Sequence, residues 1–488
     1  MTRNLFAYLL FFSSLLNASD VQDLEASLQK FIHVFNVIDA NLAEPFDPTT
    51  SIYRGALPGM VRTLDPYSAF LDSHQFEALQ EMQRSTEKGF GSVVNLLPGR
   101  AIVLQTLPGS PSERAGLLAG DEILAVNGYQ LSQLPIEQLV ALLNQARQSR
   151  AALVVKRPSI QRLMPIDLIP AELADPSVTR ILLLEDGIGH IKVANFEQQT
   201  ADELRDAIEE LGGHDLDGLI LDLRGNPGGV VETAVQTVTF FLKPDQQILW
   251  IQGRDGPHED LRVPEGLEFY EFSLAVLIDS KTASAAELVT SALQDNGRAI
   301  ILGERSFGKG IIQSVYPLSE GAALALTTAQ YLTPSRKVIQ RPLGDCRVFL
   351  LAKCSEVSTG EGSTSQQNGG IQPDEVILPR GYTTLEAVLE STNSFFEFSQ
   401  KYRAYGITPD ADLVISDHLL DEFQAFLSNR KIQPSLAEWT TALTFIRSRL
   451  KQEIFNLAFG VDKGDEVEIL RDPQVLMAVR QVKRKIEK

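Results

Sequence analysis

The sequence predicts a multidomain protein of mixed α+β and α/β class with helical regions at both ends. A chain of 488 residues is too long for one compact core, so two or more domains are expected. Between residues 178 and 340, short apolar strands alternate with helical runs, which is typical of an α/β layer structure. Towards both ends, apolar residues recur at helical spacing instead.

These patterns divide the chain into five segments. The expected boundaries are residues 1–19 for an export signal, 20–84 for a helical N-terminal region, 85–160 for a small β-rich module, 161–380 for the α/β core and 381–488 for a C-terminal helical domain. Within the core, residues 344–370 include a tract rich in Ser, Thr, Gly and Gln, which indicates an inserted surface loop.

The N-terminus is typical of an export signal. A short basic start precedes the apolar run LFAYLLFFSSLL, and small residues near Ala18 allow a cut before Ser19 or Asp20. The run is short for a membrane span, so we expect no stable span once the signal is removed; a retained anchor is the alternative. A short, Arg-poor signal favours export to a bacterial periplasm or cell envelope over a chloroplast-type lumen.

Charge and composition exclude several kinds of site. Acidic residues outnumber basic ones 63 to 44, the net charge is -19 and no basic stripe is visible, so no nucleic acid partner is expected. Cys346 and Cys354 could form a disulfide in an oxidising compartment or remain reduced. The six histidines show no ligand spacing, so we expect no metal site and no cofactor.

The β-rich module contains a specific motif. Strands are predicted over residues 101–106, 122–126 and 152–156, and a helix over residues 135–148. The segment PGSPSERAGLLAGDEILAVNG, residues 108–128, resembles the middle of a PDZ domain. This resemblance implies a groove between a strand and a helix, where a peptide adds as an extra strand and its terminal carboxylate meets backbone N–H groups.

The same resemblance places the carboxylate-binding loop and the groove strand on five consecutive residues. They are Gly89, Phe90, Gly91, Ser92 and Val93. The alternative is a PDZ fold that only packs as a spacer.

Two segments of the core carry the strongest signal. LDLRGNPGGVVE, residues 221–232, and DSKTASAAELVTSALQDNGRAIILGERSFGKG, residues 279–310, together resemble the carboxyl-terminal processing, or tail-specific, serine proteases. Further matches before the PDZ motif and after the insertion extend the resemblance over about residues 50–380. It implies an αβα core of the ClpP/crotonase-like type.

The resemblance also assigns catalytic residues. The family's nucleophile lies three residues before a glutamate, here Glu287, which identifies Ser284. The family's lysine falls on Lys309 in SFGKG, and its helper glutamine falls on Gln313. The glycine pair Gly228 and Gly229 would supply one oxyanion donor, with Gly229 preferred, and the N–H of Ala285 would supply the other.

Physical reasoning supports Ser284 independently. A helix predicted towards Gln294 would begin at Ser284, where its N-terminal N–H groups stabilise developing negative charge. A serine at this place can also be a simple helix cap. A neutral lysine is the base that a serine nucleophile requires, and the apolar residues around Lys309 favour that form; a solvated loop lysine is the alternative.

These residues predict an exported serine endopeptidase that cleaves proteins near their C-terminal ends with a Ser-Lys dyad. Its partners would be protein or peptide substrates with exposed C-termini, recognised or gated by the PDZ domain, and a homo-oligomer is left open. A noncatalytic PDZ scaffold with a protease-like core is the alternative, and a crotonase-like acyl transfer enzyme is a third reading. A Ser-His-Asp triad is not favoured, because no histidine, His190 included, lies in a recognisable catalytic setting.

Overall fold

The computed structural model describes most of the chain. The described residues are 18–44, 47–84, 88–97, 99–107, 109–147, 149–157, 162–172, 176–254, 259–341, 369–404, 409–410 and 412–486. Most of the expected signal and nearly all of the expected insertion, with Cys346 and Cys354, lie outside them. No helix within the described ranges is long and apolar enough to cross a membrane.

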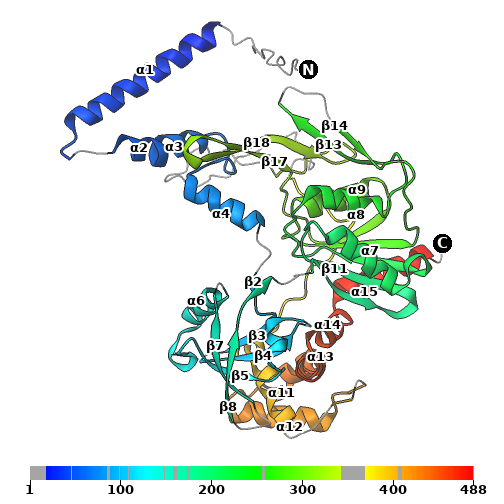
Figure 1. The fold of residues 1–488 in the computed structure, drawn as a ribbon. Helices are drawn as coiled ribbons and strands as arrows, with labels where there is room; N and C mark the ends of the chain where they lie inside the picture. The colour runs from blue at the N-terminus through cyan, green and yellow to red at the C-terminus, as the bar shows by residue number, and fades with distance from the viewer. Residues whose placement is uncertain are drawn as a thin grey trace, which may run out of the picture. The chain divides into compact units, whose positions relative to one another are not determined.

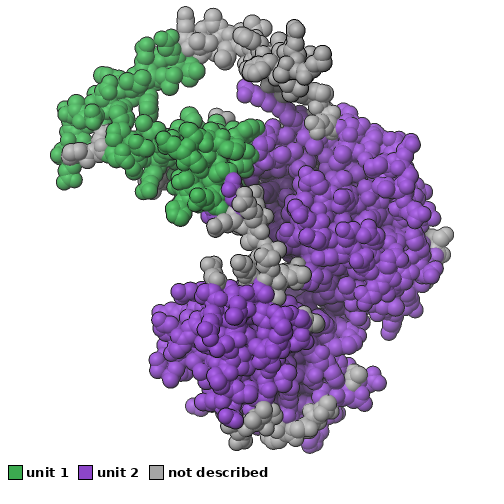
Figure 2. Space-filling view, in the orientation of Figure 1, with its two compact units in different colours: residues 1–77, 315–326 green, residues 78–314, 327–488 purple. Residues whose placement is uncertain are grey.

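The chain forms two compact units (Figure 2). The first contains residues 1–77 and 315–326. Its helices are α1 (Ala18–Asn41), α2 (Pro48–Ser51), η1 (Ile52–Ala56) and α3 (Leu57–Val61), and α4 (Ser73–Arg84) begins in it. Strand β1 (Ala69–Leu71) pairs antiparallel with residues 323–325 of β18 (Ala323–Leu332). Asp65 holds the turn before β1, because its carboxylate accepts the N–H groups of Tyr67 and Ser68, each at 2.7 Å.

The second unit includes the β-rich module. Its strands are β3 (Ser92–Leu97), β4 (Arg100–Thr106), β5 (Glu122–Val126), β7 (Ala151–Lys156) and β8 (Leu163–Leu168), paired in that order and antiparallel, with β6 (Tyr129–Gln130) beside β5. Helices α5 (Pro111–Arg114) and α6 (Ile136–Ala146) complete it. The predicted strands and helix are confirmed. Val103 of β4 and Val155 of β7 are fully buried and pack in one core with the fully buried Leu139 of α6.

The protease-like core is a six-stranded sheet in the same unit (Figure 1). Its order is β10 (Val178–Leu183), β11 (Ile188–Val193), β12 (Gly218–Asp222), β15 (Ser273–Ile278), β16 (Ala299–Gly303) and β19 (Glu375–Val376), parallel except at β10. Helices α7 (Thr200–Leu211), α8 (Val231–Thr239) and α9 (Ala285–Asp295) pack on one face of this sheet. The predicted alternation of strands and helices is confirmed.

The opposite face of that sheet is covered by the last helix of the chain, α15 (Pro473–Ile486). Val475, Ala478 and Val482 are buried there against Ile220, Leu277 and neighbouring strand residues. Gly218 leaves the space for this helix, since a methyl group at its Cα would lie 2.2 Å from Val482. The αβα layers therefore depend on a segment near the C-terminus.

The remaining strands and helices form a second sheet and a helical group. Strands β13 (Gln247–Gly253), β14 (Glu259–Arg262) and β17 (Ile311–Pro317) join β18 in a second sheet. Helices α10 (Thr384–Ser391), α11 (Ser394–Ala404), α12 (Asp417–Asn429), α13 (Leu436–Phe459) and α14 (Val461–Ile469) follow. The first four of them enclose an aromatic core with Phe395, Phe423 and Phe445. Phe396 and Leu457 pack on the β-rich module at Leu97 and Ile102.

Candidate active site

Ser284 stands between β15 and α9, directly before the first turn of the helix. Its backbone angles are φ 55° and ψ -121°, which a residue with a side chain adopts only under strain. Asp279 fixes the turn, because its Oδ1 accepts the N–H of Thr282 at 3.0 Å and the N–H of Gly225 at 2.9 Å. The predicted helix start is confirmed, and the strained backbone turns the serine out of the regular helix.

Glu287 joins Ser284 to the segment that carries Lys309. Its Oε2 accepts the backbone N–H of Ser284 at 2.9 Å and that of Lys309 at 2.8 Å. Its Oε1 accepts the hydroxyl of Ser306 at 2.5 Å and the N–H of Gly308 at 2.7 Å. One fully buried carboxylate therefore brings Ser284 and Lys309 together, although the two residues are far apart in the sequence.

The electrostatics of Glu287 reflect two opposing effects. Burial raises the pKa of its carboxyl, and the hydrogen bonds from Ser306 and from the N–H groups of Lys309, Gly308 and Ser284 partly offset that rise. Four donors around two oxygens suit an ionised carboxylate. A protonated carboxyl group would point its own O–H at one of these donors.

Lys309 and Gln313 lie on the segment that leads into β17. Lys309 precedes the strand and is partly exposed, like Ser284. Gln313 is the third residue of β17 and is exposed. The Ser306 hydroxyl also accepts the N–H of Ile371 at 2.6 Å, so the residue after the inserted segment helps to hold the lysine loop.

The glycine loop, residues 225–229, lies against Ser284. A methyl group on Gly228 would be 2.7 Å from Cβ of Ser284, so only glycine fits there. The N–H of Gly228 donates to Oδ1 of Asn226 at 2.8 Å. Within the part of the chain that the structure describes, the N–H groups of Gly229 and Ala285 meet no protein acceptor. This geometry favours Gly229 over Gly228 as a donor to a bound group.

His190, considered above for a Ser-His-Asp triad, belongs to a separate network on the core sheet. His190 is buried on β11, with Nδ1 at 3.2 Å from the carbonyl of Arg180 and Nε2 at 3.5 Å from Asp222. Asp222 binds the guanidinium of Arg224. Among the described residues, no group of three or more His, Cys, Asp or Glu side chains is placed to hold a metal ion.

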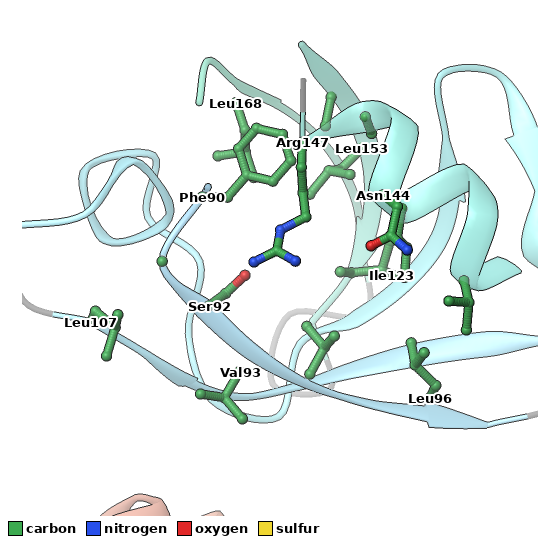
Figure 3. Close-up of a pocket in the computed structure, with 16 residues that line it drawn as sticks. Phe90, Ser92, Val93, Leu96, Leu107, Ile123, Asn144, Arg147, Leu153 and Leu168 are labelled. Carbon is green, nitrogen blue, oxygen red and sulfur yellow. The ribbon is translucent and has the colours of Figure 1, made fainter. Parts of the chain in front are cut away.

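A second site is the groove of the β-rich module (Figure 3), with a volume of about 400 Å³. Four of the five residues predicted to bind a peptide, Phe90, Gly91, Ser92 and Val93, line it. The fifth, Gly89, lies in β2 (Lys88–Gly89) and pairs with Ala171 of β9 (Ala171–Glu172). The other lining residues are mostly apolar, including Leu107, Ile123, Leu143 and Leu168, with Asn144 and Arg147 as the polar ones from α6 and its end. Strand β3 is at the sheet edge, with β4 as its neighbour, so its other side can pair with an added strand.

Sequence reasoning used Glu287 only as a landmark and missed Asp279 as an organising residue. A signal for Glu287 exists, because Ser284 and Glu287 have the spacing of a capping box. No local signal shows that its carboxylate also reaches residues 306–309.

Comparisons with known proteins give the family and the domain that the chain resembles. Residues 187–344 match the model of peptidase family S41, and residues 102–157 match that of the PDZ domain. The carboxy-terminal processing protease CtpA of Bacillus subtilis is 28% identical over 338 residues, which cover 67% of this chain and 70% of that protein. A carboxyl-terminal-processing protease of Synechocystis sp. is 31% identical over 298 residues, covering 59% and 68% respectively. Among solved structures, a photosystem II D1 C-terminal processing protease has 26% identity and a TM-score of 0.41, covering 70% of this chain and 86% of its own.

Proposed function

Because the chain belongs to the carboxyl-terminal processing proteases, it is a protease acting on protein substrates, and we propose that Ser284 and Lys309 are its catalytic dyad. The observation that carries the proposal is the carboxylate of Glu287, whose Oε2 accepts the backbone N–H groups of both residues. One buried anchor holds the backbones of both residues, which would keep a serine nucleophile and a lysine base on neighbouring segments.

The proposed reaction is acyl transfer through the serine. Neutral Lys309 takes the proton of the Ser284 hydroxyl while Oγ attacks the scissile carbonyl carbon. The protonated lysine then gives that proton to the leaving amine as the peptide bond breaks. A water molecule attacks the acyl-enzyme, with Lys309 again as the base, and releases the new C-terminus. Gln313 would orient the amine through its side-chain oxygen.

The oxyanion would be stabilised by the N–H groups of Gly229 and Ala285. Ala285 directly follows Ser284, and Gly229 follows Gly228, which lies against Ser284; neither N–H meets an acceptor in the described parts of the protein. The N-terminal end of α9 adds a favourable field for the negative charge that develops.

The PDZ groove would receive the C-terminal end of the substrate. Its apolar lining suits apolar terminal residues, and the edge strand β3 suits a peptide that adds as a strand. Whether the bound tail recruits the substrate or opens the active site, the groove selects chains with a free and flexible C-terminus.

We also propose that the protein is exported to a bacterial periplasm or cell envelope by a cleaved signal. N-terminal sequencing of the mature protein would test this, because a start near Ser19 is expected.

An exposed apolar row on α1, with Leu24, Leu28, Phe31 and Ile38 at heptad spacing, supports self-association, which sedimentation can measure.

The deciding experiment compares wild type with Ser284→Ala and Lys309→Ala on an unfolded protein that ends in apolar residues. We expect cleavage by wild type alone, and a covalent adduct on Ser284 with a serine-reactive probe detected by mass spectrometry. The same substrate with an amidated C-terminus should be cleaved more slowly. Peptide binding without cleavage or adduct would instead support the noncatalytic scaffold.

A further inference from the structure

Arg224 connects the glycine loop to the last helix of the chain. Its Nε and Nη2 donate to the two carboxylate oxygens of Asp222 at 2.9 and 2.6 Å. Its Nη1 donates to Oδ2 of Asp472 at 2.6 Å and to Oε1 of Gln474 at 2.7 Å. The planar guanidinium therefore joins the end of β12 to the start of α15, residues that are distant in the sequence.

The backbone of Arg224 is held as firmly as its side chain. Its N–H donates to Asp222 at 3.0 Å, and its carbonyl accepts Nζ of Lys192 at 2.7 Å. The next residue, Gly225, is bound to Asp279. The position of Arg224 thus sets where the loop to Gly228 and Gly229 begins.

On the other side, Asp472 has two roles. Its Oδ1 accepts the N–H of Gln474 at 2.8 Å, which caps α15, while its Oδ2 binds Arg224. Gln474 is 4% exposed and its amide nitrogen donates to the carbonyl of Ile377. Both side chains are therefore fixed by α15 and by the sheet before they meet the arginine.

The charges indicate that this contact orients Arg224 and does not merely neutralise it. Burial alone would raise the pKa of Asp222, but His190 at 3.5 Å and the hydrogen bonds and charge of Arg224 hold that pKa well below the ordinary range. Asp222 is thus an ionised partner for Arg224 already. Without Asp472 the guanidinium of Arg224 would still bind Asp222 through Nε and Nη2, but its Nη1 would lose its carboxylate acceptor.

We propose that Asp472 and Gln474 are positioning residues for the glycine loop, so that the C-terminal helix α15 is a working part of the active site. The inference rests on the proposed role of Gly229 as an oxyanion donor. It gives a positioning role to a part of the tail whose sequence carries no chemical motif.

The test uses the full-length double variant Asp472→Asn/Gln474→Leu. Asparagine preserves the helix cap but turns an amide donor towards Arg224, and leucine removes the second acceptor. Val482→Ala is the matched control, because it loosens the buried face of α15 far from Arg224. Gln474→Leu alone is the rescue, because it loses the same bond to the Ile377 carbonyl but keeps the carboxylate of Asp472 on the guanidinium.

We measure kcat and KM for the apolar-tailed substrate, the Tm, and amide hydrogen exchange of residues 225–230. The double variant should lose at least about tenfold in kcat with KM within about twofold, and its loop should exchange faster. The control should lower the Tm without either effect, and the rescue should recover most of kcat.

Unchanged exchange and kcat in the double variant would overturn the inference, as would equal losses in the control. The exchange measurement does not depend on catalysis. If wild type shows no Ser284-dependent cleavage, the proposed function fails, and exchange of the loop still decides whether α15 holds it.

Discussion

Replacing Glu287 by glutamine tests the anchor between the two proposed catalytic residues. In the wild type, four hydrogen-bond donors point at the carboxylate of Glu287. The substitution keeps the shape of the side chain but replaces one carboxylate oxygen by an amide nitrogen, which donates and cannot accept. The less costly orientation keeps the oxygen towards Ser284 and Lys309, because the Ser306 hydroxyl can rotate to accept the amide. The N–H of Gly308 is then left unpaired.

The magnitude follows from these contacts. One buried N–H without an acceptor costs about 1–3 kcal/mol, and the bonds to Ser284 and Lys309 weaken because their acceptor loses its charge. Relief of the burial penalty on the charge offsets part of this loss. We therefore expect a loss of about 1–3 kcal/mol in the free energy of unfolding, and a fall of about 100-fold in kcat from the loosened dyad.

The sign of the pH dependence is also fixed. Because burial raises the pKa of Glu287 above 4.5, its carboxyl gains a proton earlier on acidification than an ordinary glutamate, and wild-type activity should fall through that pKa. The native state then binds more protons than the unfolded chain. The stability of wild type relative to Glu287→Gln should decrease as the pH rises from about 4.5 through the raised pKa.

The assay is steady-state cleavage together with thermal unfolding, and Glu386→Gln is the control. Glu386 is equally buried and has the same capping-box position in α10, where it accepts the N–H of Thr383 at 2.8 Å, outside the proposed active site. It should lose stability and keep kcat. The reasoning is refuted if Glu287→Gln retains kcat within about threefold, or if both variants lose it equally.

Three further outcomes are expected. Gly228→Ala should reduce kcat by about 100-fold or more, since its methyl group would displace Ser284, and labelling by a serine probe should fall with it. Asp222→Asn should lower the free energy of unfolding by about 3 kcal/mol at pH 7. This difference, measured by chemical unfolding, should shrink as the pH falls below 3.8, because a carboxyl with a lowered pKa loses its contribution to stability as the pH falls through its native pKa. Leu143→Glu should weaken binding of an apolar-tailed peptide at least about tenfold by fluorescence anisotropy and leave Ser284 probe labelling unchanged.

Local patterns were sufficient for much of the fold and for part of the site. The alternation of short strands with helical runs predicted the strands and helices of the core, because hydrophobic periodicity is set by neighbours along the chain. The helix that begins after Ser284 was predicted for the same reason. The order of the sheet was not, and neither was α15 as its second cover, because an amphipathic helix does not specify which surface it buries.

The contacts within the site could not be predicted from local sequence patterns either, because they join residues that are distant in the sequence. Glu287 meets Ser284 across one helical turn, which a capping box can indicate, but it meets Lys309 only because β16 lies beside β15 in the sheet. The contact of Arg224 with Asp472 depends likewise on α15 packing against β12 and β15. Residue types and motif spacing predict which groups take part, whereas tertiary packing determines which of them touch.

The strain at Ser284 shows why such packing is needed. A non-glycine residue at φ 55° and ψ -121° costs about 1–3 kcal/mol. Such a conformation persists only where several independent contacts hold the backbone in place. Here Glu287 binds its N–H, Asp279 fixes the preceding turn, and Gly228 allows the glycine loop to approach it closely. These contacts come from α9, from the end of β15 and from the glycine loop. The loss of any one should let the backbone of Ser284 relax to unstrained angles while the rest of the protein stays folded.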